Sequence, residues 1–371
     1  MFCTRMERKP GVSKEQGAVI RNEAKTVEGA AGESTKNLYA SRYIPNIVYA
    51  DGPAGLRITP SYVKYEKVNA EDAYNAETSY YFMQDDGEYV PADVTDEASY
   101  QNALSGEKEL YSSDTYYQYC TAMPIGTLLA QTWDPEVVRE VGDAVKVEML
   151  EYGVTTWLAP GMNIHRNPLC GRNFEYYSED PLITGMTAAA MTKGVQTNED
   201  GSLSGVGVTV KHFAFNSQEN ERQGTNSVVS ERAAREIYLK GFEIAVRTAK
   251  PDCVMSSYNM VDGYATFEHY GLLTEILRNE WGFDGFVMTD WYAMNTVYGV
   301  NKDKNVQGVM MYAGNDNEMP GSSEQSILAA LDEGEEMCLG DLQRSAMNML
   351  NVIKDSAVFD QMYQEVIEAE K

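Results

Sequence analysis

From Asn46 onward, short apolar runs of β-strand length alternate with segments that carry the apolar period of an α-helix. Strands and helices in this order pair as a parallel sheet through right-handed crossovers, so the alternation constrains the fold strongly. The predicted strands span residues 47–50, 154–159, 206–213, 253–257, 285–289 and, more weakly, 307–312. They are apolar on both faces, as in sheets covered by helices. We therefore expect an α/β fold, (β/α)8 and TIM-barrel-like, with irregular or missing strands because only about six are clear.

The helices between these strands have recognisable ends. Asp134 is a good N-cap, Pro135 suits the first helical position, and Gly153 is a typical stop. The other expected helices span about 181–196, 230–248, 272–281, 326–332 and 342–353.

One stretch interrupts the alternation. Between Tyr62 and Tyr119 lie eleven of the chain's 25 tyrosines, interleaved with polar residues. One interpretation is an extended surface excursion with little regular structure. The other is a lid or wall over a site, because amphipathic tyrosines suit contacts with sugars or peptides. We divide the chain into a lead-in segment over 1–45, a barrel domain over 46–354 with this insertion at about 60–120, and an acidic tail over 355–371, expected to be a solvated helix.

Charge and composition exclude several classes of partner. With 30 Lys and Arg against 56 Asp and Glu, the net charge is −26, so we expect neither nucleic acid nor an anionic membrane as a partner. No apolar run is long enough to span a bilayer. The five cysteines are scattered, and charged residues stand where a secretory signal is apolar, which favours reduced thiols and a cytoplasmic location. None of the three histidines has a ligand-spaced neighbour, so we expect no metal and no other cofactor.

Polar side chains gather at the carboxyl ends of the predicted strands. In α/β barrels the active site is built at this end, from the loops that follow the strands. Five strands that each deliver a polar group to one rim are stronger evidence than any single residue. In chain order these groups are Asp51, Arg166 and Arg172, Lys211 and His212, Tyr258, and Asp290 with Trp291.

Each of these residues also has a structural interpretation. Asp51 before Gly-Pro is a turn former, Lys211 and His212 can be a satisfied ion pair and a core histidine, and the arginines can belong to a salt-bridge network. Asp290 is harder to explain in this way. It follows the apolar run 286–288 directly, and a buried charge needs a partner.

Together the residues suggest a sugar site. Carboxylate, Lys, Arg and His side chains form hydrogen bonds with ring hydroxyls, and the face of a Trp ring packs on the C–H face of a pyranose. A carboxylate kept ionised by neighbouring cations suits attack on an oxocarbenium-like centre.

Four motifs, in this order, resemble the family 3 glycoside hydrolases, above all their β-glucosidase branch. They are Asp51–Arg57, Gly171–Glu175, Lys211–Phe213 and Met288–Trp291. The resemblance covers about 29–353, with the tyrosine-rich stretch as an insertion. It implies that Asp290 is the nucleophile of a retaining double displacement. Subsite −1 is the place of the sugar whose glycosidic bond is cleaved. The resemblance also implies which residues surround that sugar: Asp51, Arg172, Lys211, His212, Tyr258 and, beside the sugar, Trp291.

The implied activity is hydrolysis of terminal β-linked glucosyl residues from a β-glucoside or oligosaccharide. A β-xyloside or another exo-β-glycoside is an alternative substrate, because the motifs bind hydroxyls that most pyranosides share. The family's N-acetylglucosaminidase branch is disfavoured, since the loop 214–222 lacks the histidine of that branch's His-Asp dyad.

The acid/base residue is the weak point of the resemblance. In β-glucosidases of this family a glutamate on a separate α/β sandwich domain has this role, and in members with permuted order the sandwich precedes the barrel. The segment 29–47 resembles the start of such a barrel. We therefore expect the acid/base to come from a sandwich domain or subunit outside this chain; the alternative is a catalytically incomplete sugar-binding fragment of a split or truncated enzyme.

Within the chain, Glu219 and Glu221 are the nearest candidates for the proton donor, and the acidic insertion is another source. Pairing with Arg222 is the simpler role for these glutamates. Retaining glycosidases place their two carboxyl groups about 5–5.5 Å apart. We expect no carboxyl group outside the subsite −1 set to lie at that distance from Asp290, and the site to open to solvent on the leaving-group side.

Overall fold

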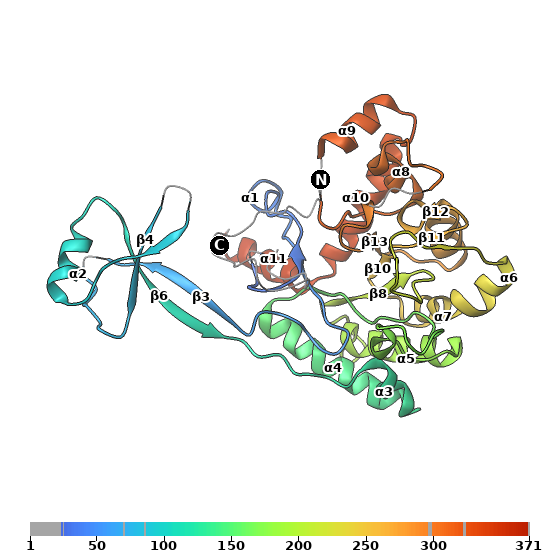
Figure 1. The fold of residues 1–371 in the computed structure, drawn as a ribbon, viewed down its shortest axis with the longest axis horizontal. Helices are drawn as coiled ribbons and strands as arrows, with labels where there is room; N and C mark the ends of the chain where they lie inside the picture. Colours follow the sequence, from blue (N-terminus) through green and yellow to red (C-terminus); the bar gives the residue numbers. More distant parts are fainter. Residues whose placement is uncertain are drawn as a thin grey trace.

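A computed structural model describes residues 24, 26–69, 71–84, 87–295, 299–321 and 324–369 of the chain. The expectations for Cys3 and the first residues of the lead-in segment lie outside these ranges. Figure 1 shows a body of strands and helices and a lobe that projects from it.

The body is built on a six-stranded sheet with the order β1-β2-β7-β8-β10-β13. Its strands are β1 (Gly32–Glu33), β2 (Val48–Ala50), β7 (Thr156–Trp157), β8 (Gly207–Phe213), β10 (Cys253–Ser256) and β13 (Phe286–Met288). All pairs from β2 to β13 are parallel, and only β1 is antiparallel to its neighbour. The sheet curls into a half-barrel. This confirms the expected α/β, (β/α)8-like fold with missing strands.

Helices account for most of the remaining body. They are α1 (Tyr39–Arg42), α3 (Gly126–Gln131), α4 (Pro135–Tyr152), α5 (Pro181–Gln196), α6 (Glu231–Ala233), α7 (Lys240–Ala249), α8 (Val306–Ala313), α9 (Glu324–Glu333), α10 (Leu339–Lys354) and α11 (Ala357–Ala369). π-Helical segments span Ala234–Tyr238 and Gly271–Glu280, and 3-10 turns span Asn173–Glu175, Thr266–Glu268 and Ala293–Asn295. A small sheet contains β9 (Asn226–Ser227), β11 (Met260–Val261) and β12 (Tyr264–Ala265). Among the described helices, none has both the length and the apolar character that crossing a membrane requires.

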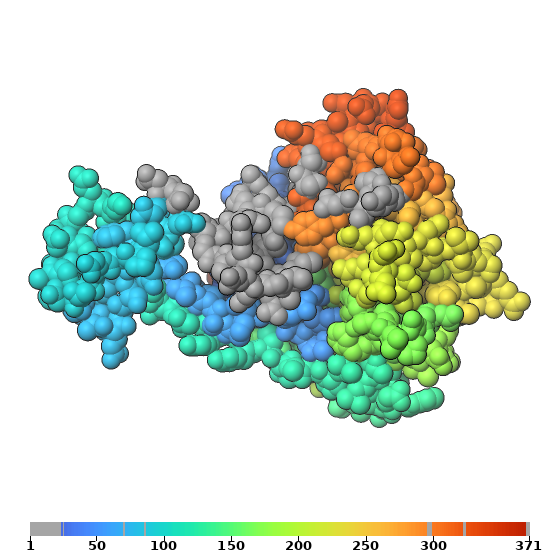
Figure 2. All heavy atoms as spheres, viewed as in Figure 1, coloured from blue at the N-terminus to red at the C-terminus, as the bar shows by residue number. Residues whose placement is uncertain are grey.

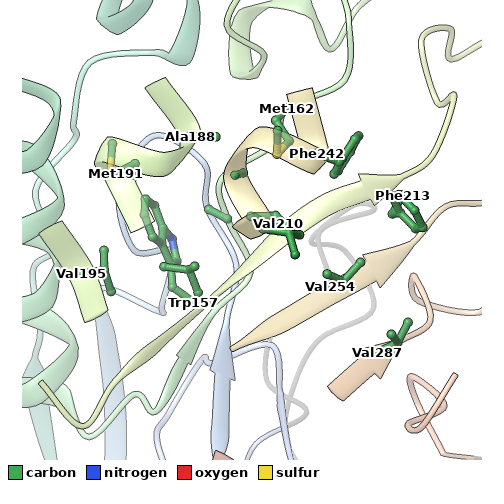
Figure 3. Packing of buried hydrophobic residues seen from close by; sticks show 14 of the residues in the cluster. Trp157, Met162, Ala188, Met191, Val195, Val210, Phe213, Phe242, Val254 and Val287 are labelled. Carbon is green, nitrogen blue, oxygen red and sulfur yellow. The ribbon is translucent and has the colours of Figure 1, made fainter. Parts of the chain in front are cut away.

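The strands are apolar on both faces because each face packs on a different set of side chains. On the outer face, Val210, Val254 and Val287 from neighbouring strands belong to one cluster with Ala188 of α5 and Phe242 of α7 (Figure 3). The alternate residues fill the interior of the curled sheet, and that cluster contains Ile47, Tyr49, Leu158, Cys253, Met255, Phe286 and Met288. This alternation leaves the strand ends as the place where polar side chains emerge.

The predicted strand over 307–312 is wrong, because these residues belong to helix α8. The side chain of Asn305 caps its first turn, and Gly314 ends it in the left-handed conformation with φ 100°. A short apolar run fits a strand and a buried helix equally well, so the two capping residues at its ends determine that this run is a helix. The sheet continues instead at Asn317, which forms a parallel bridge with Met288.

The tyrosine-rich insertion folds into a four-stranded antiparallel sheet of order β3-β6-β4-β5 with one helix. Its elements are β3 (Ser61–Lys67), β4 (Ser79–Met83), β5 (Tyr89–Pro91), α2 (Glu97–Leu104) and β6 (Leu110–Tyr117). Tyr80, Tyr100 and Leu110 form its own small core, and the rings of Tyr65 and Tyr89 stack 3.9 Å apart. The expectation of little regular structure is therefore wrong. Tyrosines that alternate with polar residues have the period of half-buried strands.

This lobe projects away from the body (Figures 1 and 2). None of its described residues lines the cavity at the strand ends. The geometry therefore does not support a lid or wall over that cavity.

Both ends of the described chain pack on the body. The lead-in segment supplies strand β1, whose neighbours Ala30 and Ala31 are buried. On helix α11, Met362 is buried and Glu365 accepts a hydrogen bond from the Tyr39 hydroxyl (3.1 Å). The four cysteines within the described ranges are free thiols.

Candidate active site

All seven side chains expected in the site line one cavity of about 280 Å³ at the carboxyl ends of the strands. They come from five strands that are distant in the sequence: Asp51 after β2, Arg172 after β7, Lys211 and His212 in β8, Tyr258 after β10, and Asp290 and Trp291 after β13. They converge because the carboxyl ends of parallel strands share one edge of the sheet. Arg166 does not join them; its side chain is exposed and lines a neighbouring cavity.

Asp51 is the anionic centre of one wall of the cavity. Lys211 Nζ donates to Asp51 Oδ1 (2.8 Å), and Arg57 donates to Oδ2. Burial raises the pKa of the Asp51 carboxyl, but the charges of Lys211 and Arg57 lower it to about 2. Asp51 is therefore ionised at any pH near neutrality, and it fixes the position of the Lys211 ammonium group.

Arg172 lies in an ion pair with Glu175, whose side chain is buried. The interpretation that the arginines belong to salt bridges is therefore correct for Arg172, although Arg172 also lines the cavity. The pair brings the guanidinium group to the cavity without adding net charge.

His212 is fixed as a neutral ring. Its backbone N–H donates to Asn163 Oδ1 (2.8 Å), and its ring Nδ1 lies 3.3 Å from the same oxygen. Burial, reinforced by the positive charges of Arg172 and Lys211, holds the pKa of the imidazole well below its usual value. In the neutral ring of His212, Nε2 can donate a hydrogen bond to a hydroxyl group or accept one from it. This Nε2 lies 3.8 Å from Asp290 Oδ2.

Asp290 has one oxygen held and one oxygen free. The backbone N–H of Trp291 donates to Asp290 Oδ1 (2.7 Å). Oδ2 is buried and accepts no hydrogen bond from a described residue. The single hydroxyl hydrogen of the nearby Tyr258 goes instead to the carbonyl of Trp291 (2.6 Å). An acceptor left unpaired in this way is ready for a group that enters the cavity.

The charge of Asp290 depends on its cationic neighbours. Burial raises the pKa of the Asp290 carboxyl, and the positive charges of Arg172 and Lys211 oppose that rise. The net effect is a raised pKa, and the site combines a desolvated carboxylate with neighbouring cations that favour its ionised form, an arrangement suited to nucleophilic attack.

Eight further residues line the cavity that the sequence reasoning did not assign to it, and Arg57, Phe174, Arg222 and Met255 are among them. Arg57 belongs to the first of the four motifs, Asp51–Arg57, so the sequence contained the information that places it near the site. Met255 is an inward residue of β10, and strict alternation along that strand identifies it. Arg222 pairs with Glu219 (2.9 Å), as expected, but its guanidinium group also lies 4.3 Å from the centre of the Tyr258 ring.

The cavity offers no free second carboxyl group. Its described carboxylates are Asp51, Glu175 and Asp290, and the first two are ion-paired. Neither Glu219 nor Glu221 lines it. Within the described ranges, no group of three or more His, Cys, Asp or Glu side chains is arranged to hold a metal ion.

Comparison with known proteins places this chain in a family. Residues 110–352, well over half of the chain, match the model described as the glycosyl hydrolase family 3 N terminal domain. The chain belongs to glycoside hydrolase family 3. This match confirms the resemblance that the four motifs predict. It begins at strand β6, so the part of the tyrosine-rich lobe before Leu110 lies outside the matched family 3 region.

Named relatives agree with the family assignment. One relative is a β-glucosidase of Ruminococcus albus, 47% identical over 234 residues, which are 62% of this chain and 24% of the relative. Another is an exo-α-(1→6)-L-arabinopyranosidase of Bifidobacterium longum, 40% identical over 63% of this chain and 29% of the relative. The chain thus spans about a quarter of the length of these curated relatives.

A solved structure extends the similarity to nearly the whole chain. β-Glucosidase 3B from Thermotoga neapolitana, solved in complex with α-D-glucose, superimposes with a TM-score of 0.68 and 39% identity. The alignment covers 91% of this chain and 39% of that one. The barrel-like architecture is therefore that of family 3.

Proposed function

We propose that this chain hydrolyses terminal β-linked glucosyl residues with net retention, through a glycosyl-enzyme ester on Asp290. The observation that carries the proposal is the unpaired Oδ2 of Asp290 in the cavity that Lys211 and Arg172 also line. The relatives named above, most of them β-glucosidases, support glucose as the sugar.

In the first step, Asp290 Oδ2 attacks the anomeric carbon of the sugar and the bond to the leaving oxygen breaks as that oxygen takes up a proton. The transition state is oxocarbenium-like, so the negative charge of Asp290 stabilises it. In the second step, a water molecule that gives up a proton attacks the same carbon and releases the carboxylate. Two inversions leave the product with the configuration of the substrate.

The other side chains of the cavity hold the sugar hydroxyls in this proposal. Asp51 is an ionised acceptor, Lys211 is a donor and His212 is a neutral partner. The cavity therefore offers hydrogen-bond donors and acceptors to the hydroxyl groups of the sugar. Arg172 and Tyr258 surround the sugar, and the ring of Trp291, which is buried, provides a flat apolar wall beside it.

The proton donor for the first step comes, in this proposal, from an α/β sandwich domain or subunit outside the chain. The described carboxylates of the cavity other than Asp290 are ion-paired, which supports this assignment. The carboxylate of Asp51 is a poor general acid, because its pKa is lowered to about 2.

Side-by-side assays test the choice of sugar. With aryl glycosides that share one good leaving group, we expect kcat/KM for the β-glucoside to exceed that for the β-xyloside and the α-L-arabinopyranoside by roughly tenfold. The arabinopyranoside is included because of the Bifidobacterium relative. Preference for either pentoside would contradict the glucosidase assignment. Glucose binding without turnover of any aryl glycoside would indicate a sugar-binding fragment.

Replacing Lys211 by methionine is expected to move the acid limb of the pH profile to higher pH. The rate falls on acidification as Asp290 takes up a proton, and Lys211 is one of the cations that lower the pKa of Asp290. Loss of its hydrogen bond should also lower kcat/KM at neutral pH by roughly tenfold. The measurement is kcat/KM for an activated aryl glucoside against pH, with Lys302→Met as an exposed control. An acid limb that stays in place, or moves to lower pH, contradicts this role.

Removing the lobe is expected to leave aryl glucosidase activity within about twofold of the intact chain, since none of its described residues lines the cavity. The two ends of the lobe are adjacent, because Gln118 N donates to Pro60 O (2.9 Å). A short Gly-Ser linker can therefore replace residues 62–116. Loss of activity in a variant that keeps the circular dichroism of the body would show that the lobe acts on the site.

A further inference from the structure

The sheet of the projecting lobe has two faces of different character (Figure 1). The register of its strands places Tyr65, Tyr81 and Tyr89 on one face. Tyr80 points to the other face, where its ring lies 5.3 Å from the ring of Tyr100 of helix α2. Helix α2 therefore covers one face of the sheet and leaves the face with the three tyrosines uncovered by it.

We call the uncovered side the tyrosine face. It consists mainly of Val63, Tyr65, Tyr81, Met83, Tyr89 and Tyr117. Much of this surface is open to solvent, since Tyr117 is 67%, Val63 47% and Met83 40% exposed. A contiguous aromatic and aliphatic surface that stays exposed is typical of a site that binds a partner.

The tyrosine face is nearly uncharged, although the lobe is strongly acidic. Over residues 60–118 the sequence has thirteen Asp and Glu residues against three Lys and no Arg. Both acidic residues of the strands, Glu66 and Asp114, point to the face that α2 covers. Among the described strand residues, Lys67 alone adds a charge to the tyrosine face, and it pairs with Glu109. The surrounding acidic groups repel a polyanion or a second copy of the lobe, so the face favours an uncharged partner.

The chemistry of the tyrosine face suits a sugar chain. A Tyr ring packs on the C–H face of a pyranose, and Tyr, Ser and Thr hydroxyl groups both donate hydrogen bonds to sugar hydroxyls and accept them. The rings are held before any ligand arrives. Tyr65 stacks on Tyr89 with ring centres 3.9 Å apart and contacts Tyr81 edge-on at 5.0 Å. Side chains that are already ordered lose little conformational entropy on binding.

The shape of the tyrosine face fits a polymer. Ser113, which lies opposite Tyr65, and Tyr117 are four residues apart on β6, roughly 13 Å along the strand. Tyr117 continues this row toward the body by stacking on Tyr119 (6.1 Å), and both rings are largely exposed. No residue of the tyrosine face lines either cavity at the strand ends. An elongated surface without a cavity suits a chain that lies across it.

We infer that the tyrosine face binds an uncharged, extended polysaccharide of the β-glucan class and holds the protein on that polymer without cleaving it. The inference goes beyond the proposed glucosidase function, because the tyrosine face and the Asp290 cavity share no residue. It gives a role to a lobe whose residues before Leu110 lie outside the matched family 3 region.

Affinity electrophoresis of the full chain tests the tyrosine face. The probe is a soluble, uncharged β-(1→3),(1→4)-glucan in a native gel, and the Asp290→Asn variant is used to prevent its hydrolysis. We expect the glucan to slow migration, also in excess glucose. Tyr117→Ser removes the most exposed ring of the face and should weaken binding about tenfold. Tyr116→Ser, at the next residue of β6, changes a ring on the other face and should bind as its parent.

The variant with a Gly-Ser linker in place of residues 62–116 is a second test. Combined with Asp290→Asn, it should migrate at the same rate with and without the glucan. With Asp290 present, it should still turn over the aryl glucoside, which shows that the body is folded. Binding of the glucan by this linker variant would place the polysaccharide site elsewhere and overturn the inference.

Other outcomes are equally decisive. Migration that the glucan does not slow, slowing that glucose reverses, equal slowing by anionic polygalacturonate, or full binding by Tyr117→Ser overturns the inference. Sedimentation provides the test of a second copy: self-association that Tyr117→Ser abolishes, without glucan binding, would assign the face to a dimer instead. Failure of the glucosidase proposal is separate, since it would show as absent aryl glucoside turnover while glucan binding persists.

Discussion

Replacing Asp290 by asparagine is expected to lower turnover of an activated aryl β-glucoside by about 10³-fold or more, because the amide cannot form the glycosyl ester. The change keeps the size of the side chain and leaves Oδ1 able to accept the hydrogen bond of Trp291 N. The measurement is kcat with saturating substrate. Asp303→Asn, at an exposed aspartate, is the matched control and should behave as the unmodified chain.

A chemical rescue separates a nucleophile from a residue that only supports the site. The Asp290→Gly variant leaves space beside the anomeric carbon, and azide should restore turnover and yield the α-glucosyl azide, formed by one inversion. Turnover by Asp290→Asn at the rate of the control, or rescue that yields only the β-configured product, contradicts a nucleophilic role for Asp290.

The second large effect concerns the proton donor. Aryl glucosides with a good leaving group need little acid assistance, whereas a disaccharide depends on a carboxylic acid at its leaving oxygen. We expect the chain to cleave the aryl substrate and to leave disaccharides nearly untouched. Adding the sandwich domain of a related family 3 β-glucosidase should raise disaccharide hydrolysis about 10²–10⁴-fold, the usual contribution of a general acid.

One result would contradict a proton donor from outside the chain. Full disaccharide hydrolysis by the chain alone, abolished by Glu219→Gln or Glu221→Gln, would show that the acid is internal. Glu175→Gln is not a clean control, because it also releases the Arg172 guanidinium group that Glu175 holds.

The framework of the body follows from local chemistry that is visible in the sequence. Helix α4 begins after Asp134 and ends before Gly153, as the capping residues predict. The strand ends were equally predictable, since buried strands are apolar runs and the first polar residue after each run marks the rim. That is why residues as distant as Asp51 and Asp290 could be expected at one cavity.

The sequence-based predictions fail where a local pattern fits two structures, or where contacts between distant segments determine the structure. Residues 307–312 satisfy both periods, and only the caps at Asn305 and Gly314 select the helix. The lobe depends on pairing between strands such as β3 and β6, with a register that no local pattern reveals. The sequence predicts only that Arg222 pairs with Glu219 and Glu221, because sequence spacing indicates an ion pair but not the Tyr258 ring that the fold brings beneath the same guanidinium group.

Mass spectrometry of the trapped intermediate tests the central claim most directly. The chain is incubated with a 2-deoxy-2-fluoro-β-glucoside carrying an activated leaving group, which slows hydrolysis of the ester more than its formation, and is then digested and sequenced. We predict one added fluoroglucosyl group, on the peptide that contains Asp290, and none in Asp290→Asn. A label on any other carboxylate, or a label that persists in Asp290→Asn, would contradict the assignment.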